Sequence, residues 1–202
     1  MFTRQGLLQS WKEIRPYFIF SIILFFAGVV VGGSPSSPEE WLSQQLKGIE
    51  QISNTVNKSA TPELTMFMLV ASNNIFISIL AMGLGIIGGI LPIFMLVTNG
   101  MVLGYLFNGI AQEGHNVWWL IVKAVLPHGI IELSAVFLAC AFGLRFGLTL
   151  LKGMLGSVLG KEKAWQPFVR TAIGSIPAII LVTVMLIVAA VVESTITYWI
   201  MS

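Results

Sequence analysis

The residues best suited to chemistry stand together inside an apolar stretch, residues 117–142. They are Pro127, His128, Gly129 and Glu132. An ionisable side chain in hydrocarbon costs on the order of 2.5–3.5 kcal/mol or more, so Glu132 needs a partner, a proton or a water-filled cavity. Glu132 follows His128 by one helical turn and shares its face, while Pro127 deprives an earlier carbonyl of its usual donor. This run is the first candidate for a functional site, with Pro127 and Gly129 as a helix break.

Three asparagines occupy a similar depth in other apolar stretches. Asn73 and Asn74 come about nine residues into the stretch 64–88, and Asn99 comes about seven residues into the stretch 92–111. At a rise of about 1.5 Å per residue, these side chains fall near the middle of a bilayer. We therefore predict one intramembrane polar cluster, which consists of Asn73, Asn74, Asn99, His128 and Glu132.

The cluster allows three interpretations. His128 and Glu132 could hold a metal ion, but two ligands without a further Cys, His or Asp in the spans make a weak metal site. They could instead form a protonatable pair on a solute or proton path. We favour a structural role, in which Glu132 bonds to Asn99, Asn73 or the freed backbone and locks the spans together. Glu193, near the end of the last apolar stretch, either joins this cluster or is hydrated at the interface. We expect no cofactor.

The composition places these residues in a membrane. Hydrophobic residues make up 56% of the 202 residues and charged residues only 10%, and aspartate is absent. A spanning helix needs about 20 mainly apolar residues, and several stretches reach that length. A closed barrel would show short alternating strands instead of long continuous runs. The sequence therefore predicts an all-α integral membrane protein and gives no sign of a soluble catalytic domain.

We predict a single polytopic membrane domain, residues 1–202, with five spans. The second and third apolar stretches are joined at Gly88, Gly89 and Pro92, which favour a tight helical hairpin. The predicted spans are 17–32, 64–88, 92–111, 117–142 and 172–198.

The distribution of lysine and arginine predicts the orientation. Basic residues dominate the segment before residue 17 and the connection 143–171, whereas acidic residues dominate the connection 34–63. Because cytoplasmic loops carry the excess of positive charge, we place the amino terminus in the cytoplasm and the carboxyl terminus outside the cytoplasmic membrane. The net charge of +2 gives no reason to expect nucleic acid as a partner.

Both longer connections carry amphipathic patterns. Ser37, Pro38 and Glu40 resemble a helix-capping box at the start of an external helix in 34–63. This helix is either a lid on the spans or a docking surface for a partner. In 143–171, leucines recur at helical spacing and predict a separate cytoplasmic helix lying on the membrane surface. These leucines are Leu144, Leu148, Leu151, Leu155 and Leu159.

Pairs of small residues four apart predict close helix packing. Gly85 and Gly89 form one pair, and Gly100 and Gly104 form another. Small residues let helix backbones approach where lipid gives no hydrophobic drive. We favour contacts within one chain, although a homodimer is also compatible with them.

The polar motifs resemble those of the stage II sporulation protein M family over most of the chain from the second span onward. The most specific element is Pro127-His128-Gly129 followed by Glu132, which is typical of a broad branch of the family outside sporulation. The other matching positions are Asn73-Asn74, Asn99-Gly100 with Gly104, Ala135, and Glu193 after Ala189-Ala190. The family's sporulation member anchors two cell-wall hydrolases in the membrane during engulfment of the forespore.

This resemblance implies a non-enzymatic membrane scaffold or complex component. Its expected partners are the lipid bilayer, a second copy, and cell-wall hydrolases or other envelope proteins. The main alternative is a small-solute channel or transporter, and a third is an intramembrane metal-dependent enzyme that uses His128 and Glu132. A scaffold is expected to have a closed, dry core, whereas a transporter needs a cavity that reaches the polar groups at mid-depth.

The predicted orientation can be tested by thiol labelling. In a Cys140→Ala background, Gln44→Cys and Ser202→Cys should each react with membrane-impermeant thiol reagents in intact cells, because both positions are predicted to lie outside. Protection of either cysteine would contradict the predicted topology.

Overall fold

The structure is a computed structural model that describes residues 4–114 and 116–197, so the predicted end of the fifth span at residue 198 lies outside the described residues. Within these ranges the chain forms helices joined by short turns, with no strand. The α-helices are α1 (Arg4–Gly32), α2 (Glu39–Asn57), α3 (Pro62–Leu84), α4 (Ile90–Gln112), α5 (Val117–Leu120), α6 (Leu126–Val158) and α7 (Gln166–Val192). Two π-helical turns are η1 (Ile121–Val125) and η2 (Glu193–Thr197).

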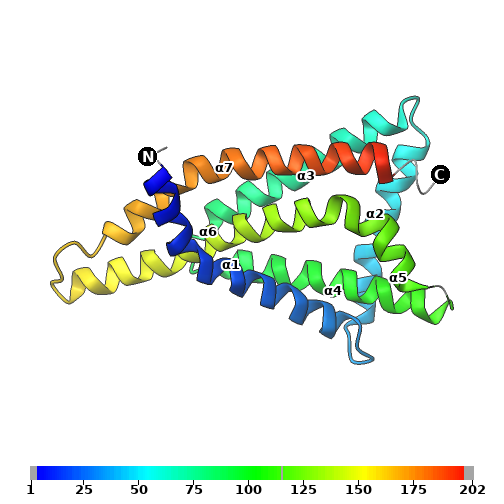
Figure 1. Ribbon diagram of the computed structural model, residues 1–202. Coiled ribbons are helices and arrows are strands. Elements are labelled where there is room, and N and C mark those ends of the chain that lie inside the picture. The colour runs from blue at the N-terminus through cyan, green and yellow to red at the C-terminus, as the bar shows by residue number, and fades with distance from the viewer. Residues whose placement is uncertain (1–3, 115, 198–202) are drawn as a thin grey trace.

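Five of the described helices are long and apolar enough to cross a membrane, which confirms the predicted all-α fold class. They are Leu8–Gly32, Pro62–Leu84, Ile90–Gln112, Leu126–Val158 and Gln166–Thr195. In Figure 1 these helices run along the length of the molecule, and α2 crosses one end of the bundle. We call this the α2 end, and we call the opposite end, where α1 begins, the amino-terminal end.

Helix α6 forms the centre of the bundle. In its most apolar stretch 61% of the residues are buried, compared with 22% to 33% in the other four long helices. Two hydrophobic clusters meet on it. One contains Ala139 of α6 with Ile14 of α1 and Val182 of α7, and the other contains Phe137 of α6 with Phe25 of α1. Helices α1, α3, α4 and α7 all contact α6.

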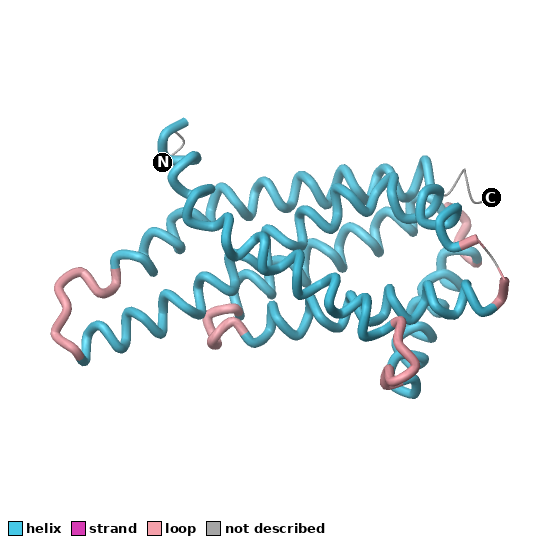
Figure 2. Tube along the Cα trace, turned by 60° about the horizontal axis from the view of Figure 1, so that its bottom comes forward, coloured by secondary structure: helices cyan, strands magenta, loops and turns pink. Residues whose placement is uncertain are grey.

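The predicted boundary after the fourth span needs a correction. The sequence placed the end of this span at Phe142 and a separate surface helix after it, but α6 continues without a break to Val158. Leu144 is buried rather than part of a lipid-facing stripe, whereas Leu148 and Leu155 are exposed. In Figure 2 the connection between α6 and α7 extends well past the turn between α3 and α4. A continued helix and a separate surface helix share the same apolar period, so periodicity alone could not distinguish them.

The start of α2 also differs from the prediction. The helix begins at Glu39 with Pro38 as its N-cap, and no side chain caps it. Its apolar face includes Leu42 and Val56, which are buried. Burial of this face, rather than a capping box, accounts for the position of α2 across the end of the bundle.

Glycines bring two pairs of helices into backbone contact. A Cβ at Gly100 or Gly104 of α4 would meet the backbone of α1, and a Cβ at Gly85 would meet the backbone of Gly143 in α6. Gly89, at a φ of 75°, lies in the turn between α3 and α4, and a Cβ there would meet Leu144. The described glycines of these pairs thus make contacts within one chain.

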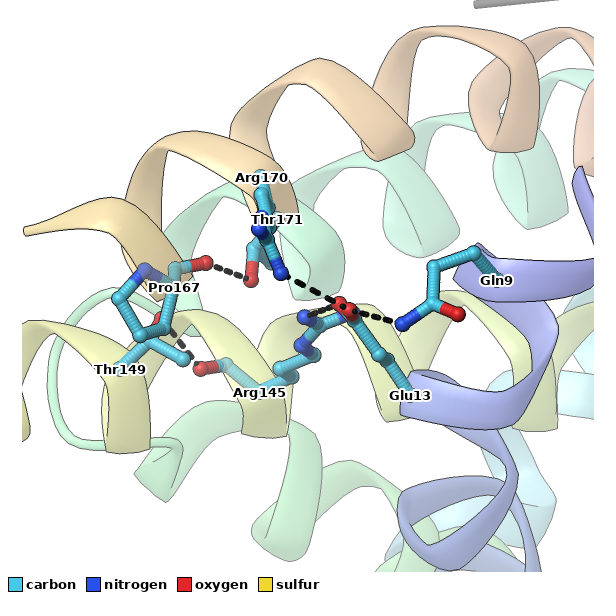
Figure 3. Close-up of polar contacts among 7 residues, drawn as sticks. All are labelled: Gln9, Glu13, Arg145, Thr149, Pro167, Arg170 and Thr171. Carbon is cyan, nitrogen blue, oxygen red and sulfur yellow. Dashed lines mark hydrogen bonds and ion pairs between the residues drawn. The ribbon is translucent and has the colours of Figure 1, made fainter. Parts of the chain in front are cut away.

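An ion-pair network ties three helices together near the amino-terminal end (Figure 3). Glu13 of α1 pairs with Arg145 of α6 and, at 3.6 Å, with Arg170 of α7, and it accepts a hydrogen bond from Gln9 at 2.9 Å. The Arg145 side chain is only 7% exposed. Because loss of one partner would leave the other charge uncompensated, this network resists separation of α1 from α6.

The glycine contacts predict a position-specific effect on stability. Gly85→Ala should lower the free energy of unfolding by about 1–3 kcal/mol, because its methyl group would collide with the backbone of Gly143. Gly83→Ala is the matched control, since a Cβ there meets nothing within 4 Å and alanine favours the helix. Thermal unfolding in detergent, followed by circular dichroism, should separate the two variants. Equal melting temperatures would contradict the close contact between α3 and α6.

Candidate functional site

The candidate site begins where the fourth span departs from regular α-helix. Pro127 has no amide hydrogen to donate to the preceding turn, and the five residues before Leu126 form the π-helical turn η1. Single π-helical turns inside helices occur frequently at functional sites. The change of helix geometry therefore lies just before the predicted helix break, and Pro127 and Gly129 themselves lie in the first turn of α6.

Glu132 has a defined polar partner on another span. The Nδ2 of Asn74 in α3 donates a hydrogen bond to Oε1 of Glu132 at 2.9 Å. Asn73 donates to Asn74 in turn, over a longer distance of 3.4 Å. The partner is therefore Asn74, not the Asn99, Asn73 or freed backbone considered from the sequence. This bond joins residues that are 58 positions apart in the chain and fixes one carboxyl oxygen of Glu132.

A partly open cavity of about 500 Å³ lies beside this bond. Its walls come from α1, α3, α4 and α6, and they include Phe25 and Met95 among apolar side chains. All five residues of the predicted cluster line the cavity, together with Gly129; they are Asn73, Asn74, Asn99, His128 and Glu132. The structure thus brings the sequence-predicted polar residues to one cavity.

In Figure 1, α3 and α4 diverge from their shared turn, and residues of both helices line the cavity. Asn74 and Asn99 both lie near the middle of their 23-residue helices, so the cavity is at mid-depth of the bundle. Asn73 and Asn99 are exposed, whereas Asn74 and Glu132 are partly buried. The cavity therefore leads from exposed amides on α3 and α4 inward to the carboxyl group of Glu132.

Glu193 joins this site from the carboxyl-terminal end of α7. The ligand atoms of His128, Glu132 and Glu193 all lie within 4.8 Å of one another. Glu193 begins η2, the second π-helical turn, which contacts α3 and α6. The sequence left open whether Glu193 joins the cluster or is hydrated at the interface, and the structure places it with the cluster.

One polar lining residue was not identified from the sequence. Ser78 is buried and contributes to the cavity wall. It follows Asn74 by one helical turn, so both side chains lie on the same face of α3. The spacing of four residues from Asn74 could have indicated Ser78 as a lining residue. Serine is common in membrane helices, however, so Ser78 was not singled out from the sequence.

Among the described residues, the acidic groups of the site form no ion pair with lysine or arginine. Glu13 makes both ion pairs found among the described residues, with Arg145 and Arg170. The Lys123 ammonium lies over the ring of Trp119, 4.7 Å from its centroid. Two carboxylates close together in a low dielectric repel each other. Either a proton neutralises one of them or a bound cation compensates both. The arrangement can therefore take up protons, bind a cation or bind a small polar solute.

Comparison with known proteins identifies related chains but no related structure. A family model described as Stage II sporulation protein M matches residues 18–198. An uncharacterized protein of Methanocaldococcus jannaschii is 28% identical over 182 residues, which cover 90% of this chain and 78% of the relative. No solved structure matches the chain.

The hydrogen bond between Asn74 and Glu132 predicts unequal effects at the two adjacent asparagines. Asn74→Ala should lower the free energy of unfolding by about 1–3 kcal/mol, because the partly buried carboxyl group of Glu132 loses its hydrogen-bond donor. Asn73→Ala should cost less, since Asn73 is exposed and makes only the 3.4 Å contact with Asn74. Thermal unfolding in detergent measures both, and an equal or larger loss for Asn73→Ala would refute this assignment.

Proposed function

The chain belongs to the stage II sporulation protein M family, and we propose that it is a non-enzymatic multi-pass membrane protein that carries a small polar or charged solute through its mid-depth cavity. The cavity of about 500 Å³ that reaches Glu132 is the observation that supports this role. The closed, dry core expected of a pure scaffold would leave no room for a solute. We therefore place transport ahead of the scaffold role suggested by the sequence.

The broken helices around the site support this proposal. η1 precedes His128, and η2 begins with Glu193, so both helices depart from α-geometry where they bring ionisable groups together. Transporter sites near the bilayer midplane are typically built from interrupted helices, because irregular backbone is tolerated there only where it lines a cavity. The two π-helical turns therefore suit a site that takes up and releases a solute.

We propose that the amino-terminal end faces the cytoplasm. Basic residues gather on α6, on α7 and in their connection, and such clusters favour the cytoplasmic side. They are Lys152, Lys161, Lys163 and Arg170. At the α2 end, Trp118 and Trp119 are exposed and suit the opposite interface. In this orientation α2 covers the extracytoplasmic end of the spans.

A scaffold role is the second candidate, and α2 is the observation that favours it. This helix buries Leu42 and Val56 against the bundle, while Gln44, Lys47 and Gln51 are exposed. A polar face held on the outside of the membrane suits recruitment of cell-wall hydrolases or other envelope proteins. A homodimer would fit either role, because a second copy could cover the exposed Asn73 and Asn99 at the cavity opening.

Reactivity of a cysteine in the cavity distinguishes the two roles. We would place Asn99→Cys in a Cys140→Ala background, reconstitute the protein in proteoliposomes and apply a membrane-impermeant trimethylammonium methanethiosulfonate to each side. A water-filled carrier site should make this cysteine react at least about tenfold faster than one in an apolar environment, because the reaction needs the thiolate. Accessibility from both sides is the expected result.

Ile130→Cys provides the matched control. Ile130 lies on α6 close to the depth of Glu132, but it is 61% exposed on the outer surface and does not line the cavity. If Asn99→Cys reacts no faster than Ile130→Cys from either side, the carrier proposal is refuted and the scaffold role takes its place.

A further inference from the structure

Three metal-binding side chains converge beside the cavity, and we propose that His128, Glu132 and Glu193 bind a divalent transition-metal cation. Their nearest ligand atoms lie within 4.8 Å of one another, so one ion could contact all three after small side-chain rotations. The binding site stands on this geometry alone. The further statement that this cation is the solute carried by the protein rests on the proposed function.

The charges of these groups match a divalent cation. Two carboxylates and a neutral imidazole together carry two negative charges, so a bound divalent ion makes the site neutral overall. Within the described ranges, no lysine or arginine pairs with Glu132 or Glu193. Because a net charge is costly at mid-depth of a membrane, such a neutral set is favourable there.

Asn74 holds one ligand in place. Its hydrogen bond of 2.9 Å engages Oε1 of Glu132 and leaves Oε2 for an ion. Outer partners of this kind orient metal ligands and strengthen binding. Asn74 therefore acts as a positioning residue for the metal ligand Glu132. If the bond only held the helices together, Asn74 would not be expected to affect metal binding.

The donor set narrows the choice of ion. One imidazole nitrogen with two carboxylate oxygens suits Zn²⁺, Mn²⁺ or Fe²⁺, whereas Cu⁺ prefers sulfur ligands. Calcium needs six to eight oxygen ligands, more than this set offers. His128 and Glu132 also line the cavity, which gives an ion a route in and leaves room for water as a further ligand.

Metal binding by the purified full-length protein tests the site directly. The protein, purified without a polyhistidine tag and stripped with a chelator, would be dialysed against ZnCl₂ and, separately, MnCl₂. Bound metal would be measured by mass spectrometry. We expect one ion per chain and, with Co²⁺ as a probe, visible absorption bands typical of nitrogen and oxygen ligands without thiolate charge transfer.

Variants then assign the ligands. Glu193→Gln should weaken binding by at least about 100-fold and Asn74→Ala by about 10–100-fold, whereas Glu63→Gln, a control at the exposed start of α3, should bind like the unmodified protein. Because Glu193→Gln keeps the size of the side chain, size-exclusion profiles should stay unchanged. Glu193→Asp, which keeps the charge but shortens the side chain, should bind more weakly than the unmodified protein.

Two results would overturn the metal site: no stoichiometric ion in the unmodified protein, or unchanged binding in both Glu193 variants. A failure of the carrier proposal would give a different result from a failure of the metal site. If the protein binds one metal ion while Asn99→Cys stays unlabelled from both sides, the site is supported as a metal site and transport is refuted.

Discussion

The whole bundle depends on one close approach, where the backbone of Gly143 in α6 meets that of Gly85 at the end of α3. Lipid provides no hydrophobic drive between helices, so van der Waals contact between backbones must hold them together. Gly147 extends the contact along the turn between α3 and α4. This packing makes α6 the central helix, and the ion pair between Arg145 and Glu13 adds α1 to the same end.

The polar site is a consequence of that arrangement. Since the turn between α3 and α4 is held against α6, the two helices separate with distance from the turn (Figure 1). Asn74 of α3 donates a hydrogen bond to Glu132 of α6, and both residues line the cavity. Polar groups in hydrocarbon need partners inside the protein. The groups that find partners in this way thus also line the cavity.

The sequence predicted those features that depend on length and local chemistry. Apolar runs indicated five spans, and Gly88 and Gly89 with Pro92 indicated the hairpin turn, where both glycines have positive φ. Features set by helix rotation were not predictable. Asn73 and Asn74 differ by about 100° around α3, so only the packed bundle decides which one faces Glu132. Glu193 reaches the site through a π-helical turn, and the leucines after Gly143 showed the same period in a continued helix as in a separate one.

The uninterrupted length of α6 has a mechanical consequence. Its 33 residues form a rod of about 50 Å, and Gly143 lies close to the midpoint. Pivoting about this fulcrum would swing the two arms, each roughly 22–25 Å long, in opposite directions. One arm carries His128 and Glu132. The other leads into the connection between α6 and α7, which projects past the turn between α3 and α4 (Figure 2). A force on the connection between α6 and α7 would therefore displace the end of α6 at the cavity by a nearly equal distance in the opposite direction.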